Sequence, residues 1–295
     1  MKKTFAAISV AILIVTGAAL SLAQDEENVR GAFLTTRPKS KERKSSPKPA
    51  RSRRRPKAAT TSTTTATTTP VKTDPATSNG THRIREQRIG LGLTLFKRDS
   101  NGMAVRVDPA REFREGDRIR VLLETNADGY LYIFNTTNEG PPVMLYPDPQ
   151  LDEGGNYVQS HVPFEIPSSL AAEERLRWLQ FDQHAGRERV YFVFSREPLS
   201  GIPLEEELIS FCAENKNSCP IKPNADLWAS IQREANHPMQ MAKAQSYGKI
   251  ETAGEREATT RGIGLSKEDP EPSLVMMTSS SDRNTLVTAL DLTHK

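Results

Sequence analysis

Alternating apolar and polar residues predict β-strands in the middle of this chain. In one run, Ile119, Val121 and Leu123 share one face, whereas Arg120 and Glu124 share the other. Successive side chains of a strand point to opposite sides of a sheet, so the apolar face is expected in a core and the charged face in water.

The next apolar run has no clearly polar face. Leu131 and Ile133 lie on one side, and Tyr130, Tyr132 and Phe134 lie on the other. Strands that are apolar on both faces belong to the interior of a packed sheet. This strand is therefore expected to be central.

Turn sequences separate these runs. Asn126-Ala-Asp-Gly129 and Asn138-Glu-Gly140 contain the residues that tight hairpins require. Residues 113–148 are therefore predicted to form a β-meander, in which each strand pairs with the next.

A further hairpin is predicted upstream. Apolar residues alternate from Ile89 to Leu95, and a turn at residues 99–102 leads into a second strand. Gly90 and Gly92 lack the third glycine and the following helix of a dinucleotide-binding loop. They are interpreted as small residues that let another backbone or side chain come close.

Between about 199 and 272 the pattern changes, and we interpret this stretch as a helical insertion. Leu208 and Phe211 belong to an apolar stripe at helical spacing, and a second helix is predicted after Asn224. Residues 236–262 show no clear period and are expected to be mobile.

Several of these segments resemble a bacterial family, the domain of unknown function 4384. The resemblance rests on an inward-facing Phe113 before Gly116-Asp117, the strand 119–124, and the runs 129–135 and 145–148. A weaker likeness extends to residues 162–167, 178–195 and 274–294, the last interpreted as a closing hairpin. The resemblance implies an all-β domain over about 85–295, usually exported or attached to the cell envelope, with the insertion as a departure. It implies no activity, cofactor or catalytic residue.

The N-terminus has the pattern of a secretory signal. Two lysines are followed by an apolar stretch up to Leu20 and by the small residues of Ser21-Leu-Ala23. Residues 1–23 are therefore predicted to be cleaved, which places the protein outside the cytoplasm, either secreted or in the periplasm or cell envelope. A retained N-terminal anchor is the alternative.

Residues 24–84 are poor in large apolar side chains and are predicted to be a disordered linker, basic at first and then rich in threonine. Between Arg37 and Lys57 eleven Lys or Arg stand against Glu42, a net charge of +10 in a chain whose net charge is +3. Lys2 and Lys3 add +2, so the remainder carries −9 and the predicted domain is acidic.

The basic stretch is the candidate contact for an anionic polymer. Its densest cations are Arg51, Arg53, Arg54, Arg55 and Lys57. Envelope polymers such as lipopolysaccharide, teichoic acid or acidic glycan fit this charge, and nucleic acid is a less favoured partner because the domain itself implies no basic face. The alternative is that the charge only keeps a linker solvated.

Cys212 and Cys219 are the two cysteines of the chain. In an exported protein they are predicted to form a disulfide that closes an eight-residue loop. A redox-active pair is the alternative, and it lacks the Cys-x-x-Cys spacing.

Residues suited to catalysis or metal binding are scattered. The histidines occur singly, and none stands at the spacing of a zinc site; they are His82, His161, His184, His237 and His294. No nucleophile elbow, phosphate loop or metalloprotease motif occurs. No cofactor or metal is therefore predicted.

The best candidate for ligand binding on the domain is the aromatic set Tyr130, Tyr132, Phe134 and Tyr146. If their face is exposed, the rings could hold a sugar, a peptide strand or a protein. The favoured interpretation is that they fill part of the core, because a strand that is apolar on both faces usually lies in the middle of a packed sheet.

These observations predict an antiparallel β-sandwich, immunoglobulin-like in general architecture, with a small helical insertion. The expected function is a non-enzymatic binding module tethered to anionic polymer by its linker. A hydrolase acting on envelope polymer, with His161 and His184 as the histidines to test, and a nucleic-acid binder are the alternatives.

Overall fold

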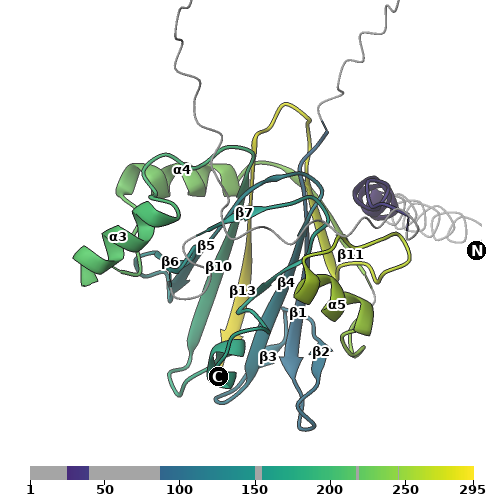
Figure 1. Cartoon of the computed structure of the whole chain (residues 1–295), viewed down its shortest axis with the longest axis horizontal. Helices are drawn as coiled ribbons and strands as arrows, with labels where there is room; N and C mark the ends of the chain where they lie inside the picture. Colours follow the sequence, from purple (N-terminus) through teal and green to yellow (C-terminus); the bar gives the residue numbers. More distant parts are fainter. Residues whose placement is uncertain (1–24, 40–86, 150–154, 217–218, 245) are drawn as a thin grey trace, which may run out of the picture.

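A computed structural model describes residues 25–39, 87–149, 155–216, 219–244 and 246–295. Two sheets face each other in these residues, as Figure 1 shows. Sheet A has the order β11 (Met239–Lys243), β12 (Leu274–Thr278), β1 (Gly90–Arg98), β4 (Arg118–Thr125), β8 (Phe164–Ile166), with β2 (Ala104–Arg106) paired to β1 and β9 (Leu179–Gln180) paired to β4. Sheet B has the order β3 (Glu112–Phe113), β13 (Thr285–His294), β10 (Gly186–Ser195), β5 (Gly129–Thr137), β6 (Val143–Tyr146), with β7 (Tyr157–Val158) paired to β5. The predicted all-β sandwich is confirmed.

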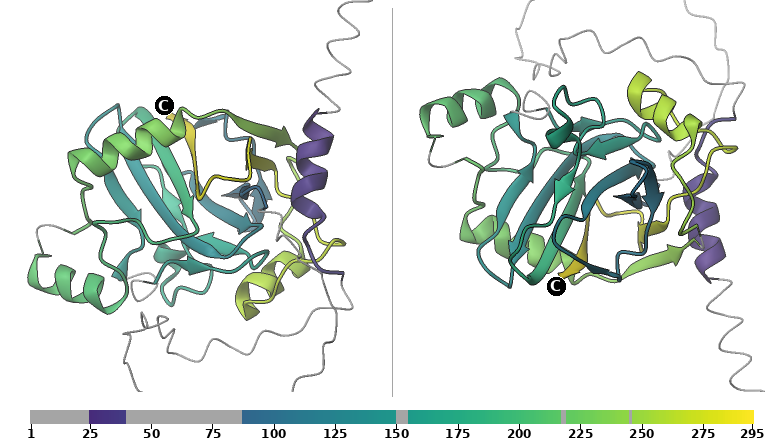
Figure 2. Two further views of the ribbon diagram at one scale, coloured as in Figure 1. Left: turned by 90° about the horizontal axis from the view of Figure 1, so that it is seen from above. Right: turned by 90° about the horizontal axis from the view of Figure 1, so that it is seen from below.

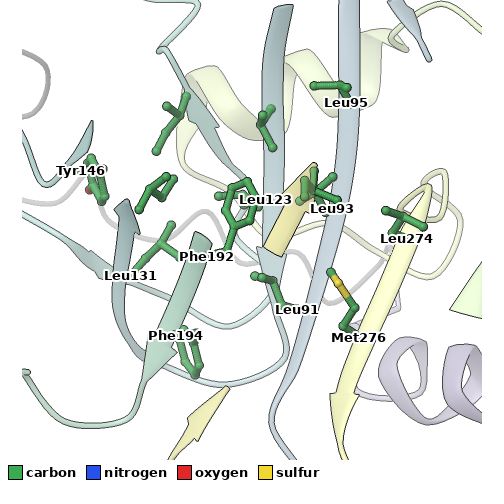
Figure 3. Packing of buried hydrophobic residues seen from close by; sticks show 14 of the residues in the cluster. Leu91, Leu93, Leu95, Leu123, Leu131, Tyr146, Phe192, Phe194, Leu274 and Met276 are labelled. Carbon is green, nitrogen blue, oxygen red and sulfur yellow. The ribbon is translucent and has the colours of Figure 1, made fainter. Parts of the chain in front are cut away.

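The main core lies between the sheets. Leu93 and Leu123, neighbours across β1 and β4, face Leu131 and Phe192 from β5 and β10, and all four side chains are essentially inaccessible to water (Figure 3). Aromatic and branched side chains of this size dominate the hydrophobic stabilisation of a sandwich. The prediction that the strand at 130–134 is central is confirmed, because β5 has β10 on one side and β6 on the other.

The predicted meander is only partly correct. β5 and β6 pair as expected, and so do β1 and β2. However, β4 belongs to sheet A and β5 to sheet B, so the turn at Asn126–Asp128 carries the chain across the sandwich instead of closing a hairpin. The predicted closing hairpin is wrong for the same reason, since β12 pairs in sheet A and β13 in sheet B.

The outer face of sheet B is covered by the insertion. Helices α3 (Glu206–Glu214) and α4 (Ala225–Ala235) appear where the periodicity predicts them, and they pack Leu208 and Ile231 against Val193. Figure 2 shows both helices on one side of the sandwich.

The outer face of sheet A is also covered, which the sequence reasoning did not predict. Residues 25–34 form a helix on this face, opposite α3 and α4 (Figure 2), and Val29 and Phe33 are buried there against β12. The prediction that disorder begins at residue 24 is therefore wrong for residues 25–39. The physical reason is that two large apolar side chains, four positions apart, have a sheet to pack against.

Residues 236–262 were expected to be mobile, and this is wrong as well. They contribute the edge strand β11 and helix α5 (Ala253–Arg261). The helix begins with a capping box, in which Thr252 and Glu255 satisfy each other's main-chain N–H groups. This helix has a weak apolar stripe, which is why periodicity alone did not reveal it.

A further helical element, η2 (Glu174–Arg177), is a short 3-10 turn before β9. Within the residues that the structure describes, none of the helices has the length and apolarity needed to cross a membrane.

Candidate functional site

The four aromatic residues of the predicted binding face do not form an exposed surface. Tyr132 and Phe134 are completely buried beneath α3 and α4, and Phe134 meets Trp228 edge-on, with 6.0 Å between ring centroids. Tyr146 lies in the main core on the opposite side of sheet B, with its hydroxyl donating to the Gly155 carbonyl at 2.6 Å. The condition for a binding face, that these rings are exposed, is therefore not met, and the core interpretation holds, with the rings divided between two separate cores.

Burial also changes the chemistry of the Tyr132 hydroxyl. Its oxygen accepts a hydrogen bond from the main-chain N–H of Leu199 at 2.9 Å. Removal from water raises the pKa of Tyr132, because the phenolate would be poorly solvated there. This tyrosine fastens the start of the insertion to β5.

The disulfide between Cys212 and Cys219 is confirmed. It joins the last turn of α3 to the segment leading into α4, and both cysteines are partly buried against the core under the helices. Its position indicates a structural role in holding the two helices together.

The predicted polyanion contacts at residues 51–57 lie outside the described residues. Arg37, the first cation of the basic stretch, is described and is buried. Its guanidinium forms a two-pronged pair with the carboxylate of Glu124, at 2.8 and 2.6 Å. It also donates to three main-chain carbonyls, those of Ser266, Asp269 and Pro270, at 3.0–3.1 Å.

Arg37 and Glu124 introduce the most unusual feature of the molecule, a layer of buried charges on the outer face of sheet A. We call it the ionic layer; its members are Arg37, Arg106, Arg120, Glu124, His161, Glu165, Glu251 and Glu255. Alternation correctly placed Arg120 and Glu124 opposite the core, but the expectation that this face is wet is wrong. Residues 25–39, α5 and the loop after it exclude water from these charges.

The first group in the ionic layer joins a hydroxyl, an imidazole and a carboxylate. His161 Nδ1 lies 2.7 Å from Glu124 Oε1, and its Nε2 lies 2.6 Å from the hydroxyl oxygen of Thr36. The backbone of His161 has φ of 58° and is held by hydrogen bonds to Thr125 and Leu265, both 2.7 Å. The imidazole is thus fixed between residues 25–39, which cover sheet A, and β4.

The second group centres on Arg106. It forms a buried ion pair with Glu255, the residue that caps α5. It also donates to the Glu271 carbonyl at 3.0 Å and lies over the ring of Phe96 at 5.5 Å. Burial lowers the pKa of Arg106, and the neighbouring Glu255 carboxylate opposes this shift.

The third group surrounds Arg120, which lies over the indole ring of Trp178 at 4.6 Å. Its guanidinium is 3.2 Å from both Glu165 and Glu251. Burial and the repulsion of Glu165 raise the pKa of Glu251 to about 7, and Arg120 and Arg256 only partly oppose this. Glu251 therefore carries a proton in part of the population near neutral pH.

Little space remains in the ionic layer. A cavity of about 10 Å³ lies among Arg37, Glu124, Glu255 and the two prolines Pro270 and Pro272. This is room for one water molecule at most. The layer fastens covering segments to sheet A through Arg37 and Arg106, whereas Arg120 Nε, Glu165 Oε1 and Glu251 Oε1 are buried without a hydrogen-bond partner among the described residues.

Gly90 and Gly92 have the role that the sequence predicted, that of admitting a close neighbour. A side-chain carbon on Gly90 would lie 2.6 Å from the ring of Phe33, and one on Gly92 would lie 2.5 Å from Pro272. The notch that these glycines leave in β1 receives the helix of residues 25–34.

The remaining histidines are not brought together. His184 is exposed beside Asp182, His237 contacts Arg283, and His294 packs against Phe181. His82 lies outside the described residues. No group of three or more His, Cys, Asp or Glu that could hold a metal occurs in the part of the chain that the structure describes.

Sequence reasoning missed the ionic layer, although two signals pointed to it. Val29 and Phe33 stand at helical spacing ahead of Arg37, and Thr252-x-x-Glu255 is a capping-box pattern. Neither signal shows which charges meet, because the partners are far apart in the sequence.

The fold and the site define a two-sheet β-sandwich with helices on both outer faces and a charged layer beneath one of them. Residues 112–198 match the family model described as a domain of unknown function (DUF4384). The match begins with β3 and ends three residues after β10. The predicted resemblance is confirmed for this part of the chain, whereas β1, β12 and residues 25–39 lie outside the match. No curated protein and no solved structure matches the chain.

Proposed function

We propose that this chain is an exported, non-enzymatic binding module that contacts an anionic polymer of the cell envelope through its basic segment. The observation that carries the proposal is the segregation of charge. Residues 39–57 contain ten Lys or Arg and one acidic residue, in a chain of net charge +3. Cations concentrated in one short stretch bind polyanions by releasing condensed counterions.

The position of residues 25–39 supports a more specific picture of the basic segment. Arg37 is fastened to sheet A, and β1 begins at Gly90 in the same sheet. The segment between them is therefore joined to the domain at both ends. The proposed contact is therefore made by a loop with two attachment points and not by a one-ended tether.

The proposal predicts salt-sensitive binding that depends on residues 51–57. We expect the full chain to bind heparin or lipopolysaccharide and to elute at a lower salt concentration once Arg51, Arg53, Arg54, Arg55 and Lys57 are replaced by glutamine. The matched control replaces five exposed cations of the domain by glutamine, namely Arg114, Arg175, Lys222, Lys249 and Arg261.

The control variant should elute close to the unchanged protein. An equal loss of binding in both variants would show that net charge, and not the basic segment, is responsible. Competition between DNA and lipopolysaccharide for the full chain ranks the two classes of polymer; preference for DNA would favour the nucleic-acid alternative.

One observation favours a second candidate, a hydrolase. Thr36, His161 and Glu124 form the hydroxyl–imidazole–carboxylate sequence found in nucleophilic catalysis. Against it, the Thr36 hydroxyl also lies 2.7 Å from the Phe33 carbonyl, and Arg37 occupies both oxygens of Glu124. Turnover of peptidoglycan or glycan that disappears in both Thr36→Val and His161→Asn, but persists in His184→Asn, would establish this candidate.

A further inference from the structure

Residues 25–39, which we call the N-terminal segment, contact the sandwich as a separate piece. The helix packs Val29 and Phe33 against Ala242, Val275 and Met277. These partners lie in β11 and β12, more than two hundred positions further along the chain. The segment therefore docks on a surface that other parts of the chain build.

Polar contacts fix how the N-terminal segment lies on that surface. Arg30 donates to the Lys243 carbonyl at 2.8 Å, and the Pro38 carbonyl accepts from the Lys267 main-chain N–H at 3.1 Å. Arg37 enters the ionic layer beside Glu124, where both side chains are at most 3% exposed. We call the surface formed by Gly90, Gly92, Glu124, Val275 and Met277 the docking surface.

The docking surface is selective. The glycine notch in β1 admits the Phe33 ring. The carboxylate of Glu124 lies within reach of the guanidinium of Arg37, which is four residues after Phe33. A segment lacking that arginine would leave a carboxylate buried without its partner, which is far more costly than an exposed one. The surface therefore recognises the pattern Phe-x-x-x-Arg, in which Phe33 lies in the last turn of the helix and Arg37 lies just beyond the end of the helix.

The stability of the docked segment depends on the surface and not on the helix itself. An isolated helix of this length is marginal in water. Its fully buried apolar anchors are two side chains, and the buried ion pair contributes more to specificity than to strength, because both charges must be desolvated. Release and redocking of the segment are consistent with this balance.

The chain does not force the segment onto its own surface. Forty-seven residues separate Lys39 from Gln87. A stretch of that length can span up to about 150 Å when extended, several times the width of a domain. A second copy of this chain offers an identical docking surface, so docking within one copy is favoured only by the higher effective concentration that the connection provides.

We propose that the N-terminal segment is exchangeable and that its docking surface accepts the same segment from a second copy of this chain. When the local protein concentration is high, docking of the segment from one copy onto another joins the two copies. It needs no polymer, and so it stands or falls separately from the proposed polyanion contact.

Two full-length variants test the exchange by complementation. In the first, Phe33→Ala and Arg37→Ala disable the segment and leave the docking surface intact. In the second, Gly90→Leu fills the notch and leaves the segment intact, because the Phe33 ring is the nearest obstacle to a side chain there. Each variant alone should be monomeric, and an equimolar mixture at about 100 µM should contain a complex of twice the molar mass by light scattering.

The replacement Gly31→Ala provides the matched control. Gly31 lies in the same helix with open space around it, so alanine should favour the helix and strengthen docking. Adding Gly31→Ala to the second variant should increase the amount of complex. Mixtures that remain monomeric at every ratio, although circular dichroism shows both variants folded, would contradict the proposal.

A second measurement does not depend on the variants folding. A site-specific protease sequence is inserted between Thr65 and Ala66 of the full chain, and the purified protein is cleaved. The N-terminal fragment should remain bound and should then be replaced by a fluorescent peptide of residues 25–39, but not by the same peptide with Phe33→Ala. A fragment that is never replaced, or immediate loss of the fragment with no peptide binding, would overturn the exchange.

Discussion

Single residues in this protein show how strongly burial controls the behaviour of a charge. Arg189 and Asp291 form an ion pair at the surface, and hydrogen bonds from Arg189 and Arg187 lower the pKa of Asp291 to about 2. Glu251 lies in the ionic layer and has a pKa raised to about 7. The two carboxyl groups differ because water is excluded from the second and a like charge stands beside it.

The raised pKa of Glu251 predicts a pH dependence of stability. Between about pH 4.5 and 7 the folded protein holds a proton that the unfolded chain has released, so the free energy of unfolding falls as pH rises through this window. In Glu251→Gln the side chain is uncharged at every pH, so this contribution to the pH dependence is absent. Relative to the unchanged protein, the variant should therefore gain stability between pH 5 and pH 8, by roughly 3 kcal/mol at most.

Urea denaturation at the two pH values measures this difference. Glu257→Gln, an exposed position on α5, is the control and should follow the unchanged protein at both. An identical pH dependence in Glu251→Gln and the unchanged protein would show that Glu251 is ionised throughout.

At the scale of elements, local sequence signals specified the strands and helices better than their partners. The turn residues at 126–129 correctly predicted a reversal after β4, but not that the chain crosses to the other sheet. Hairpin closure and sheet crossing use the same turn residues, and the difference depends on which distant strands are available. β4 pairs with β1 and β8, and β5 pairs with β10.

Helix α5 is an element whose first turn decides its stability. The Thr252 hydroxyl accepts from the Glu255 main-chain N–H at 3.2 Å, and the same Glu255 pairs with Arg106 below. Thr252→Ala should lower the free energy of unfolding by about 1 kcal/mol. Thr260→Ala, exposed at the other end of the helix, should change it by less than about 0.5 kcal/mol. Chemical denaturation of both variants tests this, and equal effects would mean that the cap contributes nothing.

At the scale of the whole molecule, the sequence predicted the sandwich but not its covering layers. Alternation identified which side chains of β4 leave the core, and it could not show that Arg120 and Glu124 are buried again from the other side. That second burial depends on residues 25–39 and on α5, which are more than eighty positions away in either direction. The candidate site was missed for this reason, whereas the disulfide between Cys212 and Cys219 needed only local information.

Sheet B has one hydrophobic core on each face, so shortening a buried side chain should have a different effect on unfolding in each core. Phe192→Ala removes a side chain between the sheets and should cost about 3–5 kcal/mol in global unfolding, with faster hydrogen exchange in both sheets. Phe134→Ala removes a side chain beneath the insertion and should speed exchange mainly in α3 and α4. Exchange measured by mass spectrometry distinguishes them, and the same pattern in both variants would show that the cores unfold as one unit.

The placement of the N-terminal segment also determines the order in which this molecule can be completed. Residues 25–39 are synthesised before every strand of the sandwich, yet Arg37 needs the carbonyls of residues 266–270 and Phe33 needs Val275 and Met277. The beginning of the chain must therefore wait for nearly the whole polypeptide, so docking of this helix is among the last steps of folding.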